Sequence, residues 1–118
     1  MAHLSKALSL TTLIFLAASS SPIRAAEHTV GMEGWEFDPV TLTIQVGDTV
    51  VWHNDDDTAH NIAFEIELDG VPTMNKPRKV RMTERWALTF DKPGVYKYTC
   101  KIHRKYDMNG VIVVKDHE

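Results

Sequence analysis

The 118-residue sequence contains a single cysteine, Cys100, so no disulfide can form within the chain. Its N-terminal apolar run, residues 7–18, is shorter than the ~20 residues that a membrane-spanning helix needs. Lysine and arginine are absent between Glu27 and Asn75. The basic residues that follow form no arginine-rich or aromatic-interleaved stretch, which argues against a nucleic-acid partner. Helical periodicity is absent beyond the N-terminal run, which argues against an α-helical domain.

The N-terminus has the pattern of a secretory signal peptide. Lys6 precedes the apolar run, and a stretch of small residues follows it and ends at Ala25-Ala26. We therefore expect residues 1–26 to be a signal peptide, cleaved after Ala25 or Ala26. Residues 27–118 then form one periplasmic or otherwise exported domain without stable membrane insertion. An unpaired cysteine in an oxidising compartment indicates either a bound metal or an intermolecular disulfide.

Charge is divided unevenly along the expected mature domain. Residues 27–75 carry eleven acidic side chains and no basic ones, whereas residues 76–118 carry eleven basic and five acidic ones. The whole of residues 27–118 therefore has a net charge of −5. The basic half contains Cys100, so one interpretation is that it steers an acidic partner toward this end. The other, which we favour, is that interleaved strands mix both signs on one surface.

Short runs of β-branched and aromatic residues, separated by glycine, proline and aspartate, predict an all-β fold. We expect strands at residues 41–46, 49–53, 62–66, 85–90, 95–100 and 111–114, with an irregular stretch at 68–79. Gly47-Asp48 lies between the first two runs and predicts a hairpin there. Regularly spaced short strands of this kind are typical of a sandwich or a barrel.

Donors for a metal ion gather near the C-terminus, where Cys100, His103 and Met108 lie within nine residues. One thiolate, two imidazoles and a weak axial thioether are the ligands of electron-transfer copper sites, and His60 is the candidate for the second imidazole. All four residues fall at ends of predicted strands, which meet at one pole of a sandwich. Zinc suits cysteine and histidine but not methionine. Four protein donors leave no open position for a substrate, so we predict that the chain is not an enzyme.

Several segments together resemble the cupredoxins, blue copper proteins, and within them the plastocyanin and pseudoazurin type. They are Phe37-Asp38-Pro39, the run from Val46 to Trp52, His60-Asn61, the run from Phe90 to Cys100, and the C-x2-H-x4-M spacing. The resemblance implies a Greek-key β-sandwich in which His60, Cys100 and His103 are equatorial copper ligands and Met108 is the axial one.

The resemblance also implies roles for residues around the ligands. It implies that the edge of His103 faces a redox partner, and that Asn61 hydrogen-bonds near the thiolate; a plain turn asparagine is the alternative. The chain departs from the pattern at Ala59, where family members commonly have proline, and at the bulky, charged loop of residues 104–107.

Two functions fit a monomeric, exported chain with one type 1 copper ion. The first is a soluble one-electron carrier whose partner is a cytochrome or a membrane redox complex, and the complete axial-methionine ligand set favours it. The alternative is a copper-handling protein for copper tolerance, which the additional methionines and histidines favour. If cleavage follows Ala25, His28 becomes the third residue and could complete a square-planar Cu(II) site with the free amine.

Overall fold

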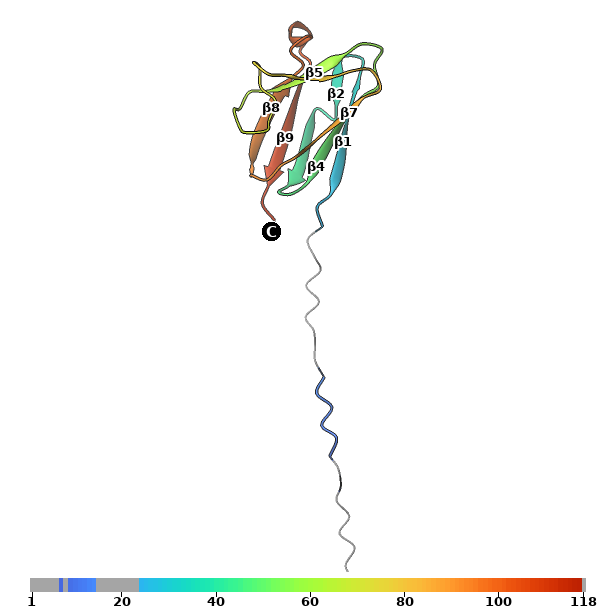
Figure 1. Cartoon of the computed structure of the whole chain (residues 1–118), viewed down its shortest axis with the longest axis vertical. Helices are drawn as coiled ribbons and strands as arrows, with labels where there is room; N and C mark the ends of the chain where they lie inside the picture. Colours follow the sequence, from blue (N-terminus) through green and yellow to red (C-terminus); the bar gives the residue numbers. More distant parts are fainter. Residues whose placement is uncertain (1–6, 8, 15–23, 118) are drawn as a thin grey trace, which may run out of the picture.

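The structure, a computed structural model, describes residues 7, 9–14 and 24–117. Two packed β-sheets form its folded part, with strand orders β2-β1-β4-β7 and β3-β9-β8-β5-β6 (Figure 1). The strands are β1 (Glu27–Glu33), β2 (Glu36–Asp38), β3 (Thr41–Gln45), β4 (Thr49–Asn54), β5 (His60–Phe64), β6 (Arg78–Val80), β7 (Arg85–Thr89), β8 (Gly94–Thr99) and β9 (Asn109–Lys115). The predicted all-β sandwich is confirmed. Most of the predicted signal peptide, residues 1–26, lies outside the described residues.

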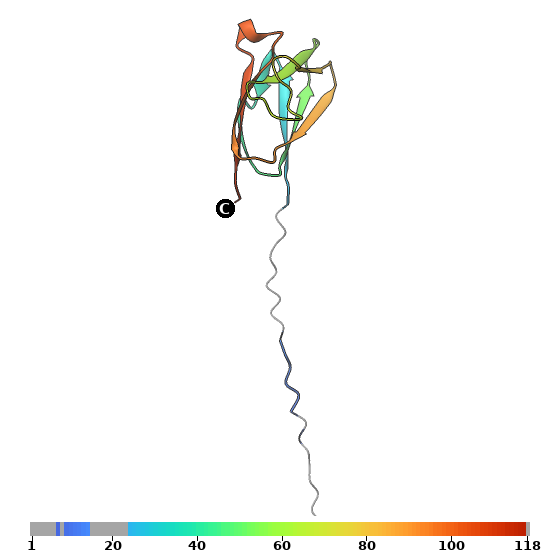
Figure 2. The same cartoon turned by 60° about the vertical axis from the view of Figure 1, so that its left-hand side comes forward.

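Alternating side chains explain why these segments form strands. In β4, Val50, Trp52 and Asn54 are buried and the residues between them are partly exposed, and in β9 Ile112 and Val114 face inward in the same way. Period-two alternation places one side of each strand in the core between the two sheets. Figure 2 shows the two layers from a second direction. Trp52 lies at the centre of an aromatic cluster formed with Phe64, Trp86, Phe90 and Tyr98.

The hairpin predicted around Gly47-Asp48 is wrong. β3 pairs in parallel with β9 in one sheet, whereas β4 pairs in parallel with β1 in the other. Gly47, with φ of +91°, carries the chain across from one sheet to the other, and its N–H donates to the Phe90 carbonyl at 2.8 Å. Turn residues between two strands are compatible with a hairpin and also with a crossover to the opposite sheet. The crossover is favoured because it lets the apolar faces of β3 and β4 pack against each other's sheets in the core.

Three strands, β1, β2 and β6, were not expected from the sequence; β1 has seven residues, and β2 and β6 have three each. The segment predicted to be irregular, 68–79, is irregular until β6 begins at Arg78. A 3-10 helix, η1 (Arg104–Tyr106), lies at the end of the sandwich opposite the marked C-terminus in Figure 1. Among the described residues, no helix has the length and apolar character needed to cross a bilayer.

Candidate metal centre

His60, Cys100 and His103 come together at the pole of the sandwich that carries η1. His60 is the first residue of β5, Cys100 directly follows β8, and His103 immediately precedes η1. Their donor atoms all lie within 4.8 Å of one another. The side chains are buried, with exposed fractions of 0%, 0% and 7% for the residues in that order. The expectation that the donors lie at strand ends and converge is therefore confirmed for these three residues.

The three donor atoms form a nearly equilateral triangle. The two Nδ1 atoms are 3.1 Å apart, and Cys100 Sγ lies 3.8 Å from His60 Nδ1 and 3.4 Å from His103 Nδ1. A circle through three atoms at these separations has a radius of about 2.0 Å, close to the bonds of about 2.0–2.3 Å that zinc makes to imidazole nitrogen and thiolate sulfur. A thiolate and two imidazoles in a buried triangle of this size fit a copper ion.

A series of short backbone hydrogen bonds shapes the loop that carries Cys100 and His103. His103 N–H donates to the Cys100 carbonyl at 3.1 Å, and Tyr106 N–H donates to the His103 carbonyl at 2.9 Å. The left-handed conformation of Asp107, φ +57°, ends η1 and turns the chain into β9. Cys100 N–H then donates to the Met108 carbonyl at 2.9 Å. Met108 is 1% exposed, so the fourth predicted ligand lies beside Cys100 and inside the protein.

Asn61 links the strand that carries His60 to the cysteine loop, as expected. Its side-chain Oδ1 accepts a hydrogen bond from Lys101 N–H at 2.6 Å, and its own N–H donates to Cys100 Sγ at 3.4 Å. Hydrogen bonds of this kind hold ligands in place and tune the metal. Because Asn61 lies within β5, the alternative of a plain turn asparagine is wrong.

Asp56 determines which nitrogen of His60 is free to bind a metal. Its Oδ2 lies 2.6 Å from His60 Nε2, and an ionised carboxylate can only accept, so Nε2 carries the proton and Nδ1 keeps its lone pair. Burial raises the pKa of Asp56, but hydrogen bonds from Gly34 N–H, His60 and Trp35 N–H outweigh it and lower the pKa below its ordinary value. The sequence analysis did not identify Asp56 as a partner of His60. The only signal in the sequence was that the two residues lie four positions apart.

An aromatic ring covers His103, the ligand whose edge is expected to face a redox partner, and the residue is 7% exposed. The indole of Trp35, in the turn between β1 and β2, stacks on the imidazole with ring centroids 4.6 Å apart and planes 22° apart. Burial, followed by the repulsion that a second protonated imidazole at His60 would exert, lowers the pKa of His103, which favours the neutral, metal-binding imidazole. No signal in the sequence placed Trp35 here, because β1 and β2 were not expected.

Charges of both signs surround this pole. Glu33 and Glu36 flank the Trp35 turn, and Arg104 and Lys105 lie in η1, whose Tyr106 contacts Trp35 with ring centroids 4.7 Å apart. All four charged residues are exposed. The acidic and basic halves of the sequence therefore meet at the site, as the mixing interpretation predicts.

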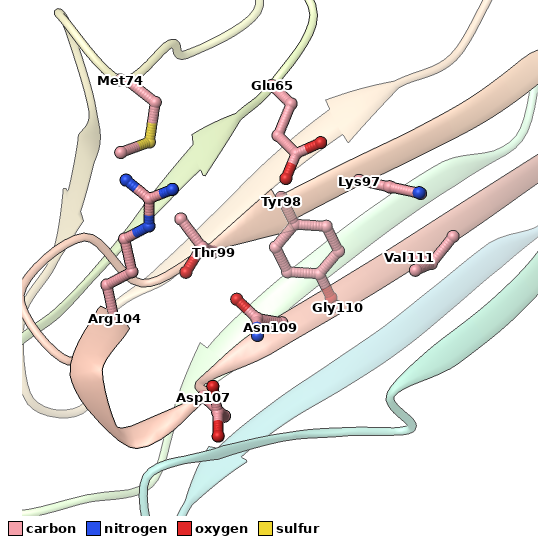
Figure 3. Close-up of a pocket in the computed structure, with 10 residues that line it drawn as sticks. All are labelled: Glu65, Met74, Lys97, Tyr98, Thr99, Arg104, Asp107, Asn109, Gly110 and Val111. Carbon is pink, nitrogen blue, oxygen red and sulfur yellow. The ribbon is translucent and has the colours of Figure 1, made fainter.

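A surface hollow of about 570 Å³ lies beside the site (Figure 3). Arg104 and Asp107 line it, together with Met74 and Lys97. The first two belong to the ligand loop, residues 100–108, which connects β8 to β9. None of the four predicted ligands lines the hollow, so it does not offer a substrate direct access to them.

His28 lies at the other pole, in β1. Its Nε2 is 2.9 Å from Asp48 Oδ2, and Ala26 N–H donates to Asp48 Oδ1 at the same distance. A square-planar chelate at residues 26–28 would require the start of β1 to separate from β4 and from Asp48.

Comparisons with known proteins agree with this donor set. Residues 25–115 match the family described as copper binding proteins, plastocyanin/azurin family. The chain is 35% identical over 86 residues to halocyanin from Natronomonas pharaonis, covering 72% of this chain but 52% of halocyanin. It is 31% identical over 102 residues to amicyanin from Paracoccus denitrificans, covering 82% of this chain and 76% of amicyanin.

Solved structures give the same result. The Cu(I) form of an amicyanin variant superposes with a TM-score of 0.67 at 28% identity, covering 80% of this chain and 87% of that one. The chain spans about half of halocyanin and 58% of the chloroplastic plastocyanin of Tetradesmus obliquus, to which it is 33% identical over 91 residues. The fold, the donor triangle and the family match lead to one conclusion: the chain belongs to the plastocyanin/azurin family of copper binding proteins.

Proposed function

We propose that this chain is a type 1 copper protein that carries one electron at a time. In this proposal His60, Cys100 and His103 are the equatorial ligands and Met108 is the axial ligand. The observation that carries it is the buried triangle of one sulfur and two Nδ1 atoms with sides of 3.1–3.8 Å. When bound, copper supplies a one-electron couple, and the protein's own residues hold the donors and exclude water.

The sheet scaffold supports electron transfer because it limits rearrangement of the ligands. His60 is fixed by strand pairing with Val80 and by Asp56, and Cys100 by hydrogen bonds to Asn61 and Met108. Cu(I) and Cu(II) prefer different geometries, so a framework in which neither form can relax keeps reorganisation small. None of the four proposed ligands lines the hollow beside the site, which supports a carrier rather than an enzyme.

Visible absorption of the oxidised, copper-loaded protein tests the ligand set. We expect an intense thiolate-to-copper band with one copper ion per chain and reversible one-electron voltammetry. Absence of the band would remove Cys100 as a ligand. A Zn(II)-loaded sample is the matched control, since zinc has no redox couple and gives no such band.

The alternative of copper handling for copper tolerance finds no further support in the arrangement of the donors. Met32 is buried in the core and Met82 is 55% exposed. Within the described part of the chain, one group of histidine, cysteine or carboxylate side chains has metal-binding spacing, and it is the triangle itself. Copper sensitivity of a deletion strain with intact respiration would favour this alternative over the carrier.

The proposed setting is an exported, monomeric protein. Residues 1–26 act as the signal peptide, and a cytochrome or membrane redox complex exchanges electrons with the mature domain. The signal-like pattern before residue 27 and the unpaired Cys100 support this setting. N-terminal sequencing of the secreted protein tests the cleavage site, and a start at Glu27 would also exclude the proposed Cu(II) chelate at His28.

A further inference from the structure

Trp35 is the outermost group above the candidate metal centre. Its indole stacks on His103 at a centroid distance of 4.6 Å. Trp35 is 39% exposed, whereas His103 is 7% exposed. A protein that approaches this pole along the stacked rings therefore meets the indole before it meets the imidazole.

The turn that carries Trp35 is held by the same carboxylate that binds His60. Trp35 has φ of +59°, a left-handed conformation that bulky side chains rarely adopt. Asp56 accepts hydrogen bonds from Gly34 N–H at 2.8 Å and from Trp35 N–H at 3.3 Å, and its Oδ2 lies 2.6 Å from His60 Nε2. One side chain therefore positions the cover of one candidate ligand and orients the other ligand directly.

Tyr106 extends the aromatic surface outward from Trp35. Its ring is 4.7 Å from the indole and tilted by 55°, and the residue is 51% exposed. Exposed aromatic residues are the side chains that most often dominate protein contacts. Charges of both signs border this surface, so the exposed aromatic rings, and not one sign of charge, are its distinctive feature.

We propose that Trp35 is the contact through which electrons enter and leave the site, and that Asp56 is the positioning residue that keeps the indole stacked on His103. The proposal deepens the proposed function and rests on it. The partner is a one-electron redox protein with an apolar patch over its own redox centre. The electron lost by the site is gained by the partner; no bond forms or breaks, no proton moves, and Trp35 is not oxidised.

The rate of electron transfer depends on the distance between the site and its partner and on what fills that space. Electron tunnelling weakens steeply as the gap between donor and acceptor grows, and it is weaker through empty space than through contacting atoms. The stacked indole fills the space between His103 and the partner with a conjugated ring. Its removal leaves either a gap or a poorly packed contact.

Electron self-exchange between oxidised and reduced copies of the copper-loaded protein is the most direct test. Identical copies have no driving force between them, so a change in reduction potential does not alter the rate through that term. We expect Trp35→Ala to slow self-exchange, measured by NMR line broadening, by at least about tenfold, the effect of truncating a central aromatic contact. Trp35→Phe should retain most of the rate.

Val95→Ala is the matched control for loss of exposed apolar surface. Val95 is 60% exposed and lies at the start of β8, the end remote from Cys100. We expect it to exchange at the wild-type rate. If Trp35→Ala exchanges at or above the wild-type rate while its visible spectrum is unchanged, the indole is a shield and the proposal is overturned.

Asp56→Asn and its neighbour Asp57→Asn separate positioning from charge. Both remove one negative charge, but Asp57 is exposed, whereas Asp56 holds the turn. We expect only Asp56→Asn to slow self-exchange and to diminish the ring-current shifts that the indole imposes on His103 protons in the Cu(I) protein. Equal effects of the two variants would contradict the positioning role. If the wild-type protein shows no thiolate band and no exchange, the proposed function fails, and this inference with it.

Discussion

β4 runs between two aspartates, Asp48 before its first residue and Asp56 after its last. Each carboxylate accepts two backbone N–H hydrogen bonds and contacts the Nε2 atom of one histidine. For Asp48 the partners are Ala26 N–H, Gln45 N–H and His28, and for Asp56 they are Gly34 N–H, Trp35 N–H and His60. The same local chemistry therefore closes both poles of the sandwich.

The two arrangements differ in what the histidine does next. The His28 side chain is 27% exposed, whereas the His60 side chain is fully buried and its Nδ1 faces Cys100 and His103. At the Asp48 pole the carboxylate stabilises the start of β1 through Ala26 and His28. At the Asp56 pole it also leaves a lone pair aimed at a metal. The comparison shows that convergence of further donors, and not the aspartate–histidine pair alone, makes a metal centre.

Cys100→Ser should disable the metal pole most completely. Removing the thiolate removes the charge-transfer partner of copper, so the visible band of the copper-loaded protein should disappear entirely. Absorption spectroscopy measures this, with Asp48→Asn as the control that keeps the band. A Cys100→Ser protein that kept the band would show that the absorbing ligand lies elsewhere.

Asp48→Asn should weaken the opposite pole without touching the copper site. Hydrogen bonds to a charged acceptor typically contribute 1.5–3 kcal/mol, so we expect the free energy of unfolding to fall by about 1–3 kcal/mol. Denaturant unfolding of the copper-free chain measures this loss, and the visible spectrum after copper loading should match the wild type. A stability equal to that of the wild type would mean that these hydrogen bonds contribute nothing net.

Lowering the pH should remove the contribution that ionised Asp48 makes to the free energy of unfolding. Burial raises the pKa of Asp48, but hydrogen bonds from Ala26 N–H, His28 and Gln45 N–H outweigh it and lower the pKa from 3.8 to about 2. A pKa lowered by folding stabilises the protein above the unfolded value, and this stabilisation is lost as pH falls from about 3.8 to about 2. The stability difference between wild type and Asp48→Asn should therefore shrink over that range. A constant difference would contradict the assignment.

Met108→Leu should change the site much less than Cys100→Ser does. The visible band should remain, and the reduction potential should rise because a weak donor to Cu(II) is lost. Voltammetry measures the shift, and Met82→Leu, at an exposed methionine, is the control that should not change the potential. A lowered potential in Met108→Leu would argue against axial coordination.

Local composition predicted six of the nine strands that the structure describes, because runs of β-branched and aromatic residues mark them, but it missed β1, which at seven residues is as long as β9. It failed for strand pairing. Gly47-Asp48 is good turn chemistry, but a turn cannot specify whether the next strand returns beside the last or crosses to the opposite sheet. β2 and β6 have three residues each, too few for a periodic signal.

The sequence by itself determined the donor chemistry of this protein. Thiolate, imidazole and thioether are properties of side chains, and the spacing of Cys100, His103 and Met108 is local, so copper could be inferred before any fold was known. Only the tertiary structure decided which nitrogen of His60 is free, and that Trp35 covers His103. Both results depend on contacts between residues far apart in the chain or in different loops, Asp56 with His60 and Trp35 with His103. Strand pairing and core packing bring these residues together, and neither leaves a local pattern in the sequence.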